Sequence, residues 1–137
     1  MNKRLGLFSF MGVGYALSLS RLLRVVEAGC VYPLPFVPLG VEGMLIQGTE
    51  LVPMLGCAWL TGSQEAAVAG FQVVVASEYG AMALPADKTQ GIVAEARGNW
   101  QPEPKSRFGF LTHSFCYQEV SYRMVNIDAL AVSLIRS

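Results

Sequence analysis

Short runs in which apolar and polar residues alternate recur along most of the chain, separated by turn-forming residues. Near the start, Phe8 and Phe10 would share one face of a strand, and Tyr15 and Leu17 would share a face after a glycine turn. Such short strands predict a mainly β protein, either a sandwich or a barrel. We expect strands at residues 5–11, 15–18, 44–46, 51–55, 71–77, 81–84, 91–94 and 120–127.

Four other segments lack this alternation. Residues 20–27, where Ser20 can cap, and residues 128–135 are expected to form helical turns. Residues 57–69 are expected to form a loop or short helix that ends at Gly70. Prolines among polar residues at 99–106 predict an exposed loop.

The first nineteen residues allow two interpretations. A basic start followed by an apolar run is typical of a signal peptide, but glycines and serines interrupt this run and no Ala-x-Ala cleavage site follows it. The run is also shorter than the ~20 apolar residues of a membrane-spanning helix. We therefore favour a β-hairpin at this end of the chain and expect no insertion into a membrane.

The segment from residue 33 to residue 54 is the most informative. Three prolines near its start give a stiff, extended lead-in, because proline restricts its own backbone and that of the preceding residue. We expect Gly43 and Gly48 to lie at turns on either side of a short strand. Pro53 should lie on the returning strand, where no N–H is needed for the ladder.

Five segments, taken in order, resemble the chemotaxis coupling-protein (CheW-like) family. Residues 43–54 are similar to the family's Gly-Val-Ile-Asn-x-Arg-Gly-x-x-x-Pro-Val, and residues 83–93 to its Gly-Leu-x-Val-Asp-x-Val-x-Gly-Val-Val. The other three matching segments are 7–18, 22–27 and 124–130. No single motif is strong, but their order and spacing together are moderately specific.

The chain departs from the family pattern at several positions. Ile46 stands where the family has Asn, Gly48 where it has Arg, and Asn126 where it has Asp. The hairpin Arg is among the family's binding residues, and this chain has Gly48 in its place. The apolar pattern and the turns persist, so the implied fold is unaffected.

The resemblance implies two small five-stranded SH3-like β-barrel lobes around a shared core, with a short C-terminal helix. It implies a single domain over residues 1–137 with the lobe boundary near 70–80, and an N-terminal strand that joins the second lobe. Asp87 is expected to cap or fasten a turn. Gly91 is expected to lie at a structural turn in the same matching segment.

Composition agrees with a compact protein that sits between partners, and equally with an ordinary core-rich β-protein. Hydrophobic residues make up 53% of the chain and charged residues only 15%, which predicts an unusually apolar surface. Ten basic and ten acidic residues cancel. A neutral chain without clustered Lys and Arg offers no footprint for nucleic acid.

Candidate chemistry is sparse. The three cysteines, Cys30, Cys57 and Cys116, form no CxxC pair, and His113 is the single histidine, so neither a metal site nor a disulfide framework is expected. His113 and Cys116 are three apart and would point to opposite faces of a strand. A thiol enzyme would require one exposed cysteine with a lowered pKa.

Two tryptophans, Trp59 and Trp100, lie next to presumed loops. Each either anchors a partner or covers the end of a barrel, and tryptophans are usually largely buried.

The leading interpretation is a non-enzymatic cytoplasmic adaptor without cofactors. By resemblance it would couple the cytoplasmic tip of a chemoreceptor to the regulatory domain of a histidine kinase, with an apolar groove between lobes holding a receptor helical hairpin. The interface candidates are Leu22, Leu23, Val25, Val26, Leu45 and Gly48, and each apolar member has a plain core role as its alternative. The competing hypothesis is a secreted β-barrel that binds a small apolar ligand.

Overall fold

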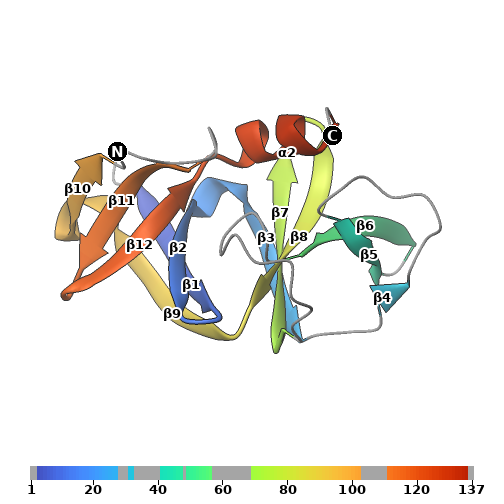
Figure 1. The fold of residues 1–137 in the computed structure, drawn as a ribbon, viewed down its shortest axis with the longest axis horizontal. Helices are drawn as coiled ribbons and strands as arrows, with labels where there is room; N and C mark the ends of the chain where they lie inside the picture. Colours follow the sequence, from blue (N-terminus) through green and yellow to red (C-terminus); the bar gives the residue numbers. More distant parts are fainter. Residues whose placement is uncertain are drawn as a thin grey trace.

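Two β-sheets lie side by side along the long axis of the molecule, with one helix above their junction (Figure 1). The computed structural model describes residues 3–27, 31–32, 41–47, 49–56, 69–102 and 111–135. Within these residues each sheet has six strands, where five per lobe were expected. The fold class predicted from the sequence, mainly β with two lobes and a short C-terminal helix, is confirmed.

The terminal sheet contains strands from both ends of the chain. Its strands, in spatial order, are β10 (Asn99–Pro102), β11 (Leu111–Tyr117), β12 (Val120–Val125), β2 (Val13–Ser18), β1 (Arg4–Phe10) and β9 (Lys88–Ala94). The middle sheet contains β3 (Leu22–Glu27), β7 (Phe71–Ser77), β8 (Gly80–Ala86), β6 (Glu50–Leu55), β5 (Val41–Gln47) and β4 (Val31–Tyr32). The helix is α2 (Ile127–Ile135), and two 3-10 turns are η1 (Leu19–Arg21) and η2 (Glu95–Arg97).

The chain passes between the sheets twice. It leaves the terminal sheet through η1 after β2, and it returns at Asp87 between β8 and β9. Residues 70–80, where the lobe boundary is expected, cover β7 and the turn into β8, and these two strands pair with each other along their whole length. β1 pairs with β2 on one side and with β9 on the other.

Residues 22–27 form a strand and not the helical turns expected from the sequence. Exposure alternates strictly along β3, which is the period of a strand, and β3 pairs with β7 from Leu22↔Val75 to Glu27↔Phe71. The helical part is limited to the three residues of η1. A short apolar run fits either structure, and pairing with a neighbouring strand decides between them.

The expected loop at residues 99–106 begins as a strand. β10 covers Asn99–Pro102, and Trp100 lies opposite Phe115 of β11. Pro102 ends β10, a position compatible with its missing N–H. The segment 57–68, with Cys57 and Trp59, and Cys30 lie outside the described residues.

One hydrophobic core joins both sheets and the helix. The largest buried cluster takes Phe10 and Tyr15 from the terminal sheet, Val73 and Leu84 from the middle sheet, and Leu130 from α2. Two smaller clusters fill the individual sheets, one around Phe115 and one around Leu45. The two sheets are therefore parts of one packed unit.

The N-terminal segment forms the expected hairpin. β1 and β2 pair from Leu5↔Ser18 to Phe10↔Val13, and Met11 and Gly12 form the turn with φ of 52° and 79°. Positive φ at both central residues matches the right-handed twist of the strands. Among the described helices, none has the length and apolar character needed to cross a membrane.

Candidate protein-interaction surface

Two of the exposed residues of β3 are apolar. Leu23 and Val25 are 50% and 37% exposed. A single exposed aliphatic residue is normal on a protein surface, but these two lie close together on one strand. Val25 lies opposite Val73, and directly opposed residues of an antiparallel pair share a face. Since Val73 belongs to the core shared by the two sheets, Val25 lies on the side of the middle sheet that faces this core. Leu23 lies at a register shift between Leu22 and Arg24.

A second pair of exposed apolar residues lies near the end of the β5–β6 hairpin. Ile46 and Leu51 are cross-strand partners, and they are 45% and 63% exposed. Directly opposed side chains contact each other across an antiparallel pair. This apolar pair is therefore presented to solvent as a unit.

An ion pair joins β3 to β6. Arg24 of β3 lies with a guanidinium nitrogen 3.5 Å from a carboxylate oxygen of Glu50, the first residue of β6. Both side chains are substantially exposed, so the pair contributes little to stability. It nevertheless places the middle of β3 beside the start of β6, where Leu51 follows Glu50.

The structure divides the six interface candidates. Leu23 and Val25 are exposed, while Leu22 and Val26 are partly buried and pack against the shared core and the middle-sheet core, respectively. Leu45 is 1% exposed, so it is a core residue of the middle sheet and not part of a free surface. Gly48 lies outside the described residues.

The four expected turn residues have different environments. Gly43 lies inside β5 at a register shift and not at a turn, and Pro53 of β6 lies opposite Met44. Asp87 joins β8 to β9, and its Oδ2 accepts a hydrogen bond of 2.9 Å from the Met11 backbone N–H in the β1–β2 turn. Gly91 lies within β9 with φ of 106°, at a register shift against β1. A left-handed backbone at this bulge favours glycine.

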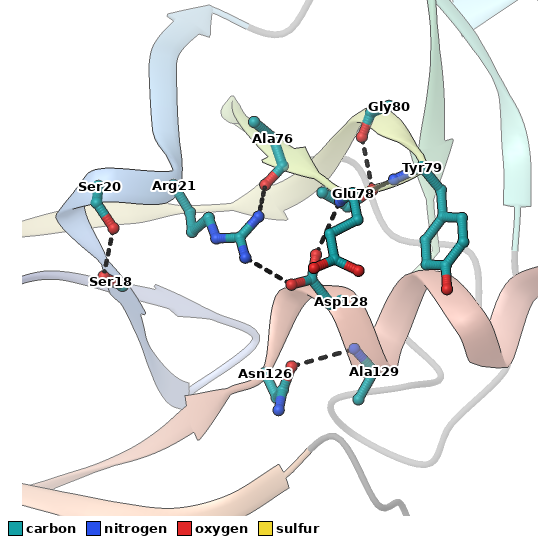
Figure 2. A network of polar contacts seen from close by, with 11 residues as sticks. Ser18, Ser20, Arg21, Ala76, Glu78, Tyr79, Gly80, Asn126, Asp128 and Ala129 are labelled. Atoms are coloured by element: carbon teal, nitrogen blue, oxygen red, sulfur yellow. Dashed lines mark hydrogen bonds and ion pairs between the residues drawn. The ribbon is translucent and has the colours of Figure 1, made fainter.

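Asp128 fastens the start of α2 to η1 and to the β7–β8 turn (Figure 2). Its Oδ2 accepts a hydrogen bond of 2.5 Å from Arg21 of η1, and its Oδ1 accepts one of 2.8 Å from the Glu78 backbone N–H in the β7–β8 turn. Arg21 also donates to the carbonyl oxygen of Ala76 at 3.2 Å. These contacts hold η1, and hence the start of β3, against the middle sheet.

Asn126 caps α2. Its Oδ1 accepts a hydrogen bond of 3.1 Å from the Ala129 backbone N–H (Figure 2). Its carbonyl oxygen accepts one of 3.0 Å from the Leu130 backbone N–H. Asn and Asp are both strong N-caps. The departure from the family's Asp at this position therefore preserves the local structure.

The candidate pair of His113 and Cys116 lies on β11. His113 is exposed and Cys116 is partly buried on β11, with Met124 and Ser121 as their respective cross-strand partners. Across the described ranges, His, Cys, Asp and Glu form no group of three or more that could hold a metal ion.

Two tyrosines have a raised pKa for structural reasons. Burial and, secondarily, the charge of Asp87 raise the pKa of Tyr15, whose hydroxyl donates to the Pro85 carbonyl oxygen at 2.8 Å. Burial and, secondarily, Tyr117 raise the pKa of Tyr122.

The arrangement of strands can be compared with solved structures. The crystal structure of the scaffolding protein TtCheW from Thermoanaerobacter tengcongensis matches with a TM-score of 0.79 and covers 95% of this chain and 92% of that chain. The chain has the CheW fold. Sequence identity over the match is 16%, so the similarity lies in the fold. No protein-family model matches the chain, and no curated protein matches it in sequence.

Two features of the structure have no signal in the local sequence. The pattern around Leu51 predicts a strand, but the exposure of its side chain depends on which face of β6 meets the core. The Arg21–Asp128 contact joins residues that are 107 positions apart, and no local pattern predicts such a pairing. The sequence Asn126-Ile127-Asp128 does indicate a capped helix start with an acidic residue in its first turn. It therefore points to Asp128, but not to Arg21 as its partner.

Proposed function

We propose that this chain is a non-enzymatic cytoplasmic adaptor in bacterial chemosensory signal transduction. It couples the cytoplasmic tip of a chemoreceptor to the regulatory domain of a histidine kinase through protein–protein contacts. The observation that carries the proposal is the exposure of Leu23 and Val25 on β3, in a fold shared with a scaffolding protein.

The position of β3 suits recognition of a helix. In the described part of the chain β3 is an outermost strand of the middle sheet, paired with β7 alone. An amphipathic helix that lays its apolar face along β3 would cover Leu23 and Val25. The Arg21–Asp128 contact fixes η1 and so presents β3 in one orientation, which lowers the entropic cost of binding.

The Ile46–Leu51 pair supports an apolar form of this contact. The family has Asn and Arg at positions 46 and 48, where this chain has Ile and Gly. This chain therefore lacks the positive charge and has an exposed aliphatic pair instead. Both changes favour binding through burial of apolar surface, which depends only weakly on salt concentration.

The test replaces Val25 by Asp. A charge is costly in a desolvated interface and inexpensive on a solvated surface, so Val25→Asp should weaken binding of the host's receptor tip or kinase regulatory domain by at least ~10-fold, or about 1.4 kcal/mol. Isothermal titration calorimetry measures the affinity. Thermal unfolding of the variant should remain close to that of the parent, because Val25 is 37% exposed.

The matched control is Val120→Asp, an equally drastic change at a valine that is 48% exposed on β12 of the terminal sheet. It should bind both partners like the parent. If Val25→Asp unfolds, Leu23→Asp repeats the test at a more exposed position. Normal binding by a folded β3 variant, or an equal loss in the Val120 control, would remove β3 from the interface.

A further inference from the structure

An open pocket lies at the end of the terminal sheet where β1 begins and β2 ends. Its volume is ≈ 800 Å³. The lining residues are Lys3, Arg4, Leu5, Ser18, Leu19, Ser20, Glu95, Trp100 and Met124. Neither Leu23 nor Val25 is among them, so this is a site separate from the β3 surface.

The pocket has an apolar floor and one aromatic side. Leu5 is buried, Met124 is half-buried, and Trp100 is 37% exposed. The indole of Trp100 is held in place, because its ring packs edge-on against Phe115 with 5.1 Å between centroids and against His113 with 6.2 Å. Its Nε1 donates a hydrogen bond of 3.0 Å to Glu95 Oε1. A fixed, half-exposed tryptophan is a preformed contact for an apolar group.

The rim carries unequal charge. Lys3 and Arg4 are both exposed, and they are the two cations of the pocket against the single carboxylate of Glu95. That carboxylate already accepts the indole hydrogen bond, while the Glu95 backbone N–H donates to the Lys3 carbonyl oxygen at 2.8 Å. This backbone hydrogen bond holds Lys3, one of the two cations, beside Glu95. Ser18 and Ser20, whose hydroxyls lie 3.0 Å apart, add hydrogen-bonding groups beside it (Figure 2).

We propose that this pocket binds an acidic peptide segment of a partner protein. One apolar side chain of the segment lies against Trp100, Leu5 and Met124, and flanking carboxylates lie beside Lys3 and Arg4. Charge complementarity selects an acidic segment, because the rim has a net positive charge. The openness of the pocket selects a peptide over a small metabolite, since small-molecule sites bury most of the ligand's surface.

The test uses the blocked pentapeptide Glu-Leu-Phe-Glu-Asp as the probe. Titration into the full chain should shift the indole N–H resonance of Trp100 in ¹H–¹⁵N spectra, which the Trp100→Phe variant identifies. We expect a dissociation constant of roughly 0.1–1 mM, the range of a short flexible peptide on an open site, and weaker binding as salt rises. The neutral peptide Gln-Leu-Phe-Gln-Asn should bind at least about fivefold more weakly.

Three variants separate the charges of the rim. The double substitution Lys3→Gln with Arg4→Gln should weaken binding by about fivefold or more, and Lys88→Gln, which removes an exposed cation of β9 outside the pocket, should leave it unchanged. Glu95→Gln should strengthen binding about twofold to fivefold, because it removes the one repulsive charge and keeps an oxygen for the indole. A merely structural role of Glu95 would not raise the affinity.

Several outcomes would overturn the assignment. The first two are no shift of the Trp100 resonance at 5 mM acidic peptide, and binding of the neutral peptide as tight as that of the acidic one. The other two are binding of free glutarate as tight as that of the acidic peptide, and a loss of affinity in Lys88→Gln as large as in the Lys3 and Arg4 double variant. Equal binding by glutarate would identify the site as a small-carboxylate site and reject the peptide. Because none of these measurements involves receptor or kinase, their result is independent of the adaptor function.

Discussion

At the scale of single residues, Tyr15 shows how one side chain connects the two sheets. It is fully buried, it stacks on Phe8 with 5.7 Å between ring centroids, and its hydroxyl reaches the Pro85 carbonyl oxygen of the middle sheet. A buried hydroxyl needs such a partner, because an unsatisfied one would cost roughly 1–3 kcal/mol. Asp87 lies close enough to raise the pKa of Tyr15 further, and it also fastens the β1–β2 turn.

This environment predicts a loss of stability in alkali. The ordinary pKa of tyrosine is near 10 and the folded value is raised, so the stabilisation is complete below pH ~10 and is lost as the pH rises above it. Tyr15→Phe should cost about 1 kcal/mol at neutral pH through the lost hydrogen bond and should flatten the decline above pH 10. Urea unfolding measured from pH 7 to 12 checks both effects.

The exposed Tyr79 supplies the control, since Tyr79→Phe removes a phenol that is 58% exposed. It should leave the alkaline decline as in the parent. If Tyr15→Phe loses stability in alkali as the parent does, the loss comes from other groups. Tyr122 is one candidate, because its pKa is also raised.

At the scale of elements, α2 depends on its first turn. Ile127, Leu130 and Ala131 bury one side of the helix in the shared core. Asn126 caps its N-terminus, while Asp128 ties it to η1 and to the β7–β8 turn. A nine-residue helix is marginal by itself, so these contacts and the buried side determine whether it forms.

Substitutions at Asn126 test this account. Asn126→Ala should lower the free energy of unfolding by about 1 kcal/mol, because the cap is lost. Asn126→Asp, which restores the family residue, should stay within about 0.5 kcal/mol of the parent, since Asp caps equally well and suits the helix dipole. Chemical denaturation measures both. Equal destabilisation by Ala and Asp would show that the amide has a role other than capping.

At the scale of the whole molecule, the two sheets share their core and cannot be separated along the sequence. β1 lies between β2 and β9, and its Phe8 and Phe10 enter the same cluster as Val73 and Leu84 of the middle sheet. The terminal sheet is built from both ends of the chain, which ties the N-terminal segment into the fold.

Deletion of residues 1–11 should therefore abolish cooperative unfolding of the whole chain. The deletion exposes β2 and β9 and removes part of the shared core, so the middle sheet should lose its sharp transition as well. Differential scanning calorimetry and circular dichroism follow the transition. A truncated chain with the melting curve of the parent, or with a remaining sharp transition of the middle sheet, would mean that the sheets are independent.

The sequence by itself determined the β class, the N-terminal hairpin, the helix near residue 128 and the overall likeness to one family of folds. These features depend on local information: alternation along a strand, Gly12 at a turn, and Asn126 before a helix. The order of short motifs then added the architecture, which periodicity alone would not supply.

Tertiary structure decided the rest. The segment 22–27 became β3 because β7 offers it a strand to pair with. Leu45 became core while its neighbour Ile46 stayed exposed, because successive residues of a strand point to opposite faces. The Arg21–Asp128 contact and the pocket at Trp100 join residues far apart in sequence. Such sites arise from packing over the whole chain, and the pattern along a short segment carries no information about them.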